Sequence, residues 1–265
     1  MKLSKIFCLN YSGNELEGVY WSEFDKLAKK RVLGTEADIK KHSDTDVLLV
    51  KLGTKIDKEV IDDFPNLKYI GMLGTGYGGI NTKYAKQKGV AVANIADYAT
   101  EGVAEFTFAI LLEYLRSIAK AKSQAKKGDY SDNFSAIEIM GKTFGVIGLG
   151  HIGLRTAELA KAFGANVIYW SKNRKKKAEK NGIKYSNKVF SEADILTVNL
   201  SLNPETANYV NSRRIASIKK GAIVVNPSPM ELFDFDALVS RIKKGDITFM
   251  LDHSDEMTKE GYIRE

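Results

Sequence analysis

One glycine-rich segment constrains the fold of this 265-residue chain more than any other. It reads Phe-Gly-Val-Ile-Gly-Leu-Gly-His-Ile-Gly and begins as a short apolar run at 144–147. Beyond the last glycine, residues 154–163 carry apolar side chains at the spacing of an amphipathic helix. The segment therefore predicts a buried strand, a tight turn and a helix in direct succession, which is the context of a dinucleotide-binding motif.

Each glycine of the motif has an expected physical role. Gly148 allows the tight turn, Gly150 lets the backbone approach a pyrophosphate, and Gly153 lets the helix pack closely on the strand. The N-terminus of the following helix would offer N–H groups and a positive dipole end to the phosphates. The alternative is a turn with a purely structural role, because the bare motif is common.

Composition narrows the class of protein. With 44% hydrophobic residues the chain can bury a core and suits one large or two modest domains. It has no apolar run as long as a membrane span and no signal-like N-terminus, so we expect a cytoplasmic protein without a membrane partner. The single cysteine, Cys8, excludes an internal disulfide, and the scattered histidines His42, His151 and His253 show no metal-ligand spacing.

The net charge of +7 is not evidence for nucleic-acid binding. The lysines are spread over the whole chain, and the sequence contains no recognisable nucleic-acid module. We therefore predict a lysine-rich solvated surface and no nucleic-acid partner.

The first part of the chain alternates strand-like and helix-like segments, which predicts a parallel sheet wrapped by helices. The expected strands are 5–9, 46–52, 68–73 and 90–95, and the expected helices are 21–31, 58–63 and 82–88. The glycine turn opens a second doubly wound unit, with further strands at 166–170, 193–200, 222–226 and 247–252 and helices around 215–219 and 235–244. The predicted fold is thus α/β with two parallel-sheet domains, 1–97 and 98–265.

The longest helical pattern begins at Thr100 and ends at Lys122. It is apolar around much of its circumference, so it should lie between layers or in a subunit interface. A polar loop at 126–139 connects it to the glycine turn.

A second glycine-rich loop, Gly74-Thr75-Gly76-Tyr77-Gly-Gly, follows the strand at 68–73. Its helix is short, and the next strand ends without an acidic residue that could hold a ribose. We interpret it as a backbone-lined loop that could contact a small anionic substrate.

The strand at 166–170 bears on the choice of nucleotide, because an acidic residue at this strand end normally holds the adenosine ribose. Here the strand is followed by Ser171, Lys172, Asn173 and Arg174. A carboxylate would repel a 2′-phosphate, whereas a hydroxyl and a guanidinium attract one. We predict NADP rather than NAD, with a solvated lysine run as the alternative explanation.

Several segments resemble the D-2-hydroxyacid dehydrogenase family, and together they cover nearly the whole chain. They are Leu-Lys-Tyr-Ile-Gly-Met-Leu-Gly-Thr-Gly-Tyr-Gly-Gly-Ile at 67–80, Gly-Val-Ala-Val-Ala-Asn at 89–94, Asp-Ile-Leu-Thr-Val-Asn-Leu-Ser-Leu at 194–202 and Ile-Lys-Lys-Gly-Ala-Ile-Val-Val-Asn at 218–226. The segment at 169–174 is similar to that of NADP-preferring glyoxylate and hydroxypyruvate reductases.

The resemblance implies a flavodoxin-like substrate domain, a Rossmann coenzyme domain, an active site in the cleft and a homodimer formed through the helix at 100–122. It also implies roles for individual residues. The coenzyme-binding residues would be Gly148, Gly150, His151, Ile152, Gly153, Ser171, Lys172, Asn173, Arg174, Leu200, Ser201, Thr206, Asn226, Pro227, Ser228 and Asp252. The residues that bind the substrate carboxylate would be Lys51, Gly74, Thr75, Gly76 and Tyr77.

The chain departs from the family at the three catalytic side chains. Pro229 stands where the family has the arginine that binds the keto acid, and counting to the position of the glutamate gives Met257. The Thr-Pro-His segment that carries the family's histidine does not occur in these 265 residues, nor does the closing helix that returns to the substrate domain. His253 is the weak candidate for a substitute acid, against an incidental polar residue.

Two hypotheses follow. The chain is either an NADP-preferring oxidoreductase of small 2-oxo or 2-hydroxy acids with weak or altered activity, or a catalytically inactive dinucleotide-binding sensor or scaffold. It is also open whether the 265 residues are a fragment of a longer enzyme.

Overall fold

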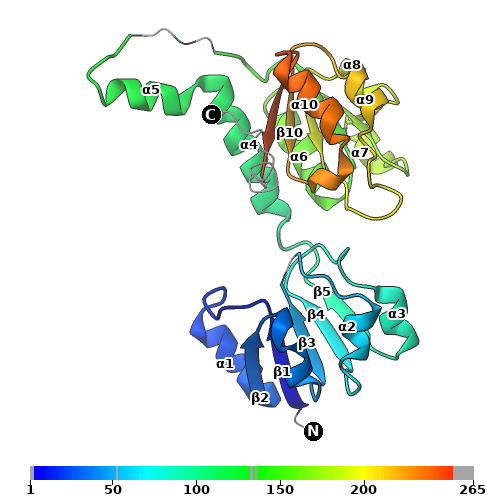
Figure 1. Ribbon diagram of the computed structural model, residues 1–265. Helices are drawn as coiled ribbons and strands as arrows, with labels where there is room; N and C mark the ends of the chain where they lie inside the picture. Colours follow the sequence, from blue (N-terminus) through cyan, green and yellow to red (C-terminus); the bar gives the residue numbers. More distant parts are fainter. Residues whose placement is uncertain (1–2, 52, 132–133, 135, 253–265) are drawn as a thin grey trace. The chain divides into compact units, whose positions relative to one another are not determined.

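The computed structural model describes residues 3–51, 53–131, 134 and 136–252. The chain divides into two units, Met1–Tyr98 and Ala99–Glu265, each built on its own parallel sheet (Figure 1). The two units are described separately below.

The first unit contains a five-stranded parallel sheet in the order β2-β1-β3-β4-β5. Its strands are β1 Leu3–Leu9, β2 Ala28–Gly34, β3 Val47–Val50, β4 Tyr69–Met72 and β5 Ala91–Asn94. This 2-1-3-4-5 order is the flavodoxin-like form of the doubly wound fold.

The helices of the first unit cover the sheet unequally. They are α1 Gly18–Leu27, the 3₁₀ helix η1 Glu36–His42, α2 Lys58–Asp62 and α3 Thr82–Gln87. On one face, Trp21 of α1 packs with Ile6 and Leu49. On the other, η1, α2 and α3 pack on a core that includes Phe7 and Leu48 (Figure 1). Alternate residues of β1 and β3 thus serve opposite faces, as a period of two requires.

One predicted element of this unit is wrong. The helix expected at 21–31 ends at Leu27, and Ala28–Gly34 forms the edge strand β2, which pairs with β1 from Leu3↔Ala28 to Leu9↔Gly34. The sequence Ala-Lys-Lys-Arg favours a helix locally, but pairing with β1 satisfies its backbone groups and overrides that weak preference. Lysines also suit an exposed sheet edge.

The second unit contains a six-stranded parallel sheet in the order β11-β10-β9-β6-β7-β8. Its strands are β6 Thr143–Ile147, β7 Asn166–Trp170, β8 Lys184–Tyr185, β9 Ile195–Val198, β10 Ala222–Asn226 and β11 Ile247–Leu251. Counted from β6, this is the 3-2-1-4-5-6 order of the Rossmann fold, and the order reverses between β6 and β9. The predicted α/β class with two doubly wound sheets is confirmed.

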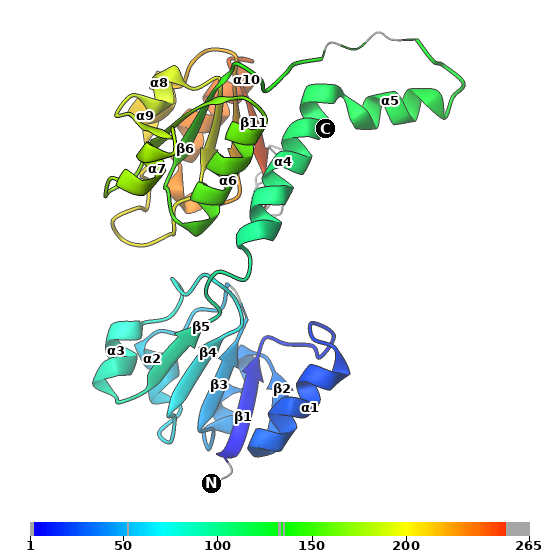
Figure 2. The ribbon, with the colours of Figure 1, turned by 180° about the vertical axis from the view of Figure 1, so that it is seen from behind.

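Helices cover both faces of this second sheet. Their bounds are α4 Thr100–Arg116, α5 Ile118–Ala125, α6 His151–Ala162, α7 Lys176–Lys180, α8 Val189–Glu192, α9 Ser212–Ser217, η2 Met230–Leu232 and α10 Phe235–Lys243. α4, α6 and α7 pack around Phe144, Val146 and Tyr169, with α6 seen in front of the sheet in Figure 2. α8, α9 and α10 pack on the opposite face, around Ile147 and Val198.

The helix expected from Thr100 to Lys122 is interrupted. Ser117 adopts a left-handed conformation (φ 50°, ψ 41°), which ends α4 at Arg116 and starts α5 in a new direction. One side of α4, including Phe108 and Leu111, is buried in the core of the second unit. Phe106 and Tyr114 on other sides stay exposed, at 38% and 43%.

Candidate functional site

The glycine turn at the end of β6 requires its first glycine. Gly148 has a φ of +91°, a backbone conformation that L side chains rarely adopt. Its N–H donates to the Trp170 carbonyl at 2.8 Å, and a Cβ at this position would lie 2.6 Å from the Asn199 carbonyl oxygen. The turn is therefore held between the ends of β7 and β9, where a side chain has no room.

The third glycine of the motif is required by packing. A Cβ on Gly153 would lie 2.0 Å from the carbonyl oxygen of Gly148. This contact brings the first turn of α6 directly against the end of β6. The helix N-terminus is thus fixed beside the glycine turn.

The middle glycine differs from the other two. A Cβ on Gly150 would meet no atom within 4 Å, and its backbone (φ −78°, ψ −160°) is one that any residue adopts. Neither packing nor strain within the described chain thus requires glycine here, and the open space lies at the N-terminus of the 12-residue helix α6. His151 and Ile152 form its first turn, in which N–H groups have no acceptor inside the helix. This geometry suits the approach of a pyrophosphate.

The loop after β9 adjoins the glycine turn at the point where the strand order reverses. The Asn199 N–H donates to the Ile147 carbonyl at 2.7 Å, and the side-chain oxygen of Asn199 is buried without a hydrogen-bond partner among the described residues. Thr206 donates its hydroxyl to the Ser201 carbonyl at 2.6 Å and so closes the loop after Leu200. A buried acceptor without a donor fits a site that a ligand completes.

The end of β7 carries Ser171 and Lys172. Ser171 is 8% exposed, and its hydroxyl donates to the Asn173 carbonyl at 2.6 Å. Lys172 pairs with Glu205 at 2.5 Å, but both side chains are about three-quarters exposed, so this pair contributes little stability.

Arg174 belongs to a more ordered network. Its Nε and Nη2 donate to the two carboxylate oxygens of Glu179 at 3.0 and 2.5 Å, and its guanidinium lies over the Tyr185 ring, 5.0 Å from the centroid. The Tyr169 hydroxyl also donates to Glu179, at 2.8 Å, and accepts from the Lys175 N–H at 2.6 Å. The Arg174 guanidinium and then the Tyr169 hydroxyl lower the pKa of Glu179.

The segment after β10 is folded on itself. The Asn226 amide donates to the Ser228 carbonyl at 2.7 Å and accepts from the Ser228 N–H at 3.1 Å, and the Ser228 hydroxyl donates to the Val198 carbonyl at 2.8 Å. Both residues are buried, whereas Asp252, beyond β11, is exposed. Pro227 and Pro229 flank Ser228, and Pro229 precedes η2 with no polar side-chain group to offer.

The structure places these coenzyme-site candidates along one edge of one sheet. They follow β6, β7, β9, β10 and β11, which run parallel, so their carboxyl ends share an edge. Ligands of doubly wound sheets bind at this edge, where the strand order reverses. His253 lies outside the described residues, and within the described ranges no three His, Cys, Asp or Glu side chains group closely enough to hold a metal ion.

The substrate-loop candidates lie at the carboxyl edge of the first unit's sheet. Lys51 follows β3 and pairs with Glu15 at 3.2 Å. Gly74 accepts from the Ile95 N–H at 3.1 Å, and the Thr75 carbonyl accepts from the Asn94 amide at 2.7 Å. The Thr75 hydroxyl oxygen is buried and has no partner among the described residues.

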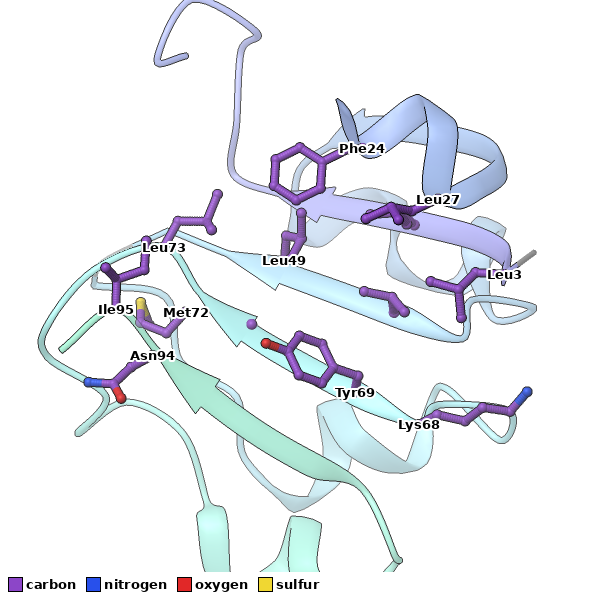
Figure 3. Close-up of a pocket in the computed structure, with 13 residues that line it drawn as sticks. Leu3, Phe24, Leu27, Leu49, Lys68, Tyr69, Met72, Leu73, Asn94 and Ile95 are labelled. Carbon is purple, nitrogen blue, oxygen red and sulfur yellow. The ribbon is translucent and has the colours of Figure 1, made fainter. Parts of the chain in front are cut away.

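An apolar hollow of about 440 Å³ lies on the face of the first unit's sheet that carries α1 (Figure 3). Phe24 and Leu27 of α1, with Leu49 and Tyr69 of the sheet, contribute to its wall. Few polar groups converge on it, so it lacks the fixed donors and acceptors that define a small polar-ligand site.

Three residues of the second unit's site were missed from sequence. Asn199 could have been found as the polar residue that ends a buried strand beside the glycine turn. Glu179 and Tyr169 could not, because only the fold shows that Tyr169 and Arg174 both donate to Glu179. Among the described residues, no helix combines the length and apolarity required to span a bilayer.

Comparison with known proteins gives a consistent assignment. Residues 108–261 match the family model for the NAD-binding domain of D-isomer specific 2-hydroxyacid dehydrogenases. The chain is 38% identical over 220 residues to a D-3-phosphoglycerate dehydrogenase of Methanocaldococcus jannaschii, covering 81% of this chain but only 42% of that protein. It is 30% identical over 248 residues to a glyoxylate reductase of Pyrococcus furiosus, covering 89% and 72%.

Solved structures agree on the fold. A D-lactate dehydrogenase from Aquifex aeolicus, complexed with NAD and lactic acid, superposes with a TM-score of 0.84 at 24% identity, covering 97% of this chain and 80% of that one. An acyclic imino acid reductase in complex with NADPH and D-Arg superposes with a TM-score of 0.80 at 28% identity, covering 94% of this chain and 82% of that one. The two complexes hold different nicotinamide cofactors. The Rossmann topology, the glycine geometry and the sequence matches together show that this chain belongs to the D-isomer specific 2-hydroxyacid dehydrogenase family.

Proposed function

We propose that the second unit binds a nicotinamide dinucleotide with its pyrophosphate over the N-terminus of α6. The observation that carries the proposal is the contrast among the three glycines. Gly148 and Gly153 are required by the protein's own packing, whereas the space at Gly150 is open and faces the helix N-terminus. A pyrophosphate is the group that such a cradle of N–H donors and a dipole end attracts.

The other proposed contacts to the cofactor come from residues that follow the strands at the carboxyl edge of the sheet. Residues 171–174 would hold the adenosine end, Leu200, Ser201 and Thr206 would line the groove, and Asn226, Pro227, Ser228 and Asp252 would lie near the nicotinamide end. The unpartnered oxygen of Asn199 supports a ligand at the same edge, since a donor from the ligand would satisfy it.

NADP is the preferred form of the cofactor in this proposal. Residues 171–174 contain no carboxylate to bind ribose hydroxyls, and Arg174 presents a guanidinium of which Nη1 has no partner among the described residues. Arg binds phosphate through two parallel N–H bonds, which Lys cannot do.

The reaction supported best is hydride transfer between the nicotinamide and a small 2-oxo or 2-hydroxy acid. NADPH, when bound, supplies the hydride. Lys51 and the loop from Gly74 to Tyr77 would hold the substrate carboxylate, and the unpartnered hydroxyl of Thr75 supports a polar ligand there. The glyoxylate reductases and D-lactate dehydrogenase among the relatives act on acids of this class.

A second candidate is dinucleotide binding without turnover, and Pro229 favours it. By the resemblance, this residue would stand at the place of the family's substrate arginine, and proline has neither a charge nor a donor. Stabilisation of charge on the substrate oxygen is usually a large part of catalysis, so its loss would leave a binding protein.

Three measurements on the full chain separate these possibilities. Titration should show that the chain binds both NADPH and NADH, and NADPH more tightly. The affinity for NADPH should fall in the Arg174→Ala variant. Oxidation of NADPH with glyoxylate, hydroxypyruvate or pyruvate supports the dehydrogenase. Saturable binding with no oxidation of NADPH by any of the three supports the non-catalytic protein, and no binding of either nucleotide refutes the proposal.

We also propose a homodimer that buries the exposed part of α4, including the half-exposed rings of Phe106 and Tyr114. Large exposed aromatic side chains on one helix are typical of subunit interfaces. Light scattering of the purified chain should give twice the mass of 29.4 kDa, and Phe106→Glu should shift it toward the monomer. A monomeric wild-type chain contradicts this proposal.

A further inference from the structure

Arg174 is held by its surroundings before any ligand arrives. Its Nε and Nη2 donate to Glu179, and the Tyr185 ring lies against one face of its guanidinium. These contacts occupy one edge and one face of the planar group. The adjacent end-on edge, formed by Nη1 and the second N–H of Nη2, has no partner among the described residues. Arg174 thus keeps a second pair of parallel donors free, which is the pair that fits a phosphate.

Glu179 is itself anchored from the core. It is the less exposed partner of the ion pair, with 21% of its side chain accessible against 61% for Arg174. The hydroxyl of Tyr169, a residue that is fully buried, donates to the same carboxylate, and this hydroxyl is fixed in turn by the Lys175 N–H. A chain of hydrogen bonds therefore connects the interior of the sheet to the guanidinium at its edge.

The neighbouring cation lacks such support. Lys172 and Glu205 pair on the surface, with side chains 74% and 72% exposed, and no buried side chain of the described residues holds either of them. Two carboxylates thus meet two cations at the same strand end, but only the Glu179 pair is both bidentate and anchored. This contrast provides a matched control.

We propose that Glu179 is a positioning residue for cofactor discrimination: it holds Arg174 so that the free guanidinium edge receives the 2′-phosphate of NADPH. The inference rests on the proposed binding of NADPH at residues 171–174. An unrestrained Arg has many rotamers to lose on binding, and a restrained one loses fewer. Repulsion between the Glu179 carboxylate and the phosphate opposes this gain, but the guanidinium charge lies between the two anions' neighbouring edges, and salt screens the repulsion at this exposed position.

The test compares the affinities of NADPH and NADH in matched variants of the full chain at physiological ionic strength. Glu179→Ala should weaken NADPH binding about fivefold or more and leave the affinity for NADH within about twofold of the wild type, because only NADPH carries the 2′-phosphate. Tyr169→Phe, which removes only the anchoring hydroxyl, should produce a smaller loss in the same direction. Glu205→Ala should change the NADPH affinity little, since Lys172 is not positioned.

Three controls make the outcomes distinct. Unchanged NADH affinity and melting temperature show that a variant is folded. If the wild type binds no dinucleotide, or if Arg174→Ala leaves NADPH affinity unchanged, the proposed function fails at this strand end. If Arg174→Ala weakens NADPH but Glu179→Ala does not, or strengthens it, the positioning inference alone is wrong. In the Arg174→Ala background, Glu179→Ala should have no further effect on NADPH, and a further loss would also overturn the inference.

Discussion

The substitution Gly150→Asp separates ligand binding from folding at the glycine turn. Gly150 is the N-cap of α6 and has an extended backbone (φ −78°, ψ −160°), which suits the N-cap geometry of Asp. No atom lies within 4 Å of the position of its Cβ. Asp is a better N-cap than Gly by about a few tenths of a kcal/mol, and its charge complements the helix dipole. The variant should therefore fold with wild-type stability or slightly more.

Binding should respond in the opposite way. The new carboxylate would project into the space assigned to the pyrophosphate, which carries two negative charges. At a separation of about 4 Å, each pair of charges costs about 1 kcal/mol even with the dielectric constant of water. The total of about 2 kcal/mol corresponds to a loss of about 30-fold in affinity, and a partly desolvated site would increase it.

Calorimetric titration with NADPH and thermal unfolding measure the two effects on the same protein. Gly150→Ser is the matched control, because it caps the helix without adding charge and should lose less affinity. Gly18→Asp introduces the same side chain at another open glycine, in the first unit, and should leave the affinity unchanged. A Gly150→Asp variant that unfolds like the wild type and binds NADPH equally well would refute the assignment of the pyrophosphate to this helix.

Three further predictions concern stability and reactivity. Gly153→Ala should lower the free energy of unfolding by about 3 kcal/mol or more, measured in guanidinium, because its Cβ would lie 2.0 Å from the Gly148 carbonyl oxygen; wild-type stability would contradict the close contact. Burial raises the pKa of Asp194, but the Lys219 ammonium at 2.5 Å and the Thr143 N–H at 2.9 Å outweigh burial and bring this pKa below its ordinary value. The stabilisation that ionised Asp194 gives the folded chain should be present above about pH 4 and disappear as the pH falls through the lowered pKa. The difference in free energy of unfolding between wild type and Asp194→Asn should therefore shrink in acid. A difference that stays constant with pH would contradict this prediction. Burial raises the pKa of Cys8 to about 12, so iodoacetamide at pH 8 should label it only after unfolding; rapid labelling of the folded chain would show that the thiol is accessible.

Much of the fold was predictable because its signals are local. Apolar runs and glycine turns at 144–153 predicted β6, its turn and α6 in the correct order. The long-range features were not predictable in this way. Ala28–Gly34 has a helix-favouring composition and became a strand because β1 offers it backbone partners. The break at Ser117 depends on a left-handed backbone conformation, and the sequence has no glycine at this position that would have predicted it.

The candidate site also has a part that was predictable from local sequence and a part that depends on long-range contacts. Distinct roles could be predicted for Gly148, Gly150 and Gly153 because each role constrains one residue and its immediate neighbours, and the close contacts at Gly148 and Gly153 agree with the roles predicted for those two. The network of Arg174, Glu179 and Tyr169 joins residues that only the fold brings together, so the sequence showed a basic strand end but not how its arginine is held.

Hydrogen exchange of the full chain with and without saturating NADPH tests the central assignment most directly. We predict slower exchange at two places on the carboxyl edge of the second sheet, the first turn of α6 from His151 onward and residues 171–174. The amides of β1 in the first unit should exchange at the same rate in both states. Saturating NADPH that leaves exchange at the start of α6 unchanged would contradict the claim that this helix holds the cofactor.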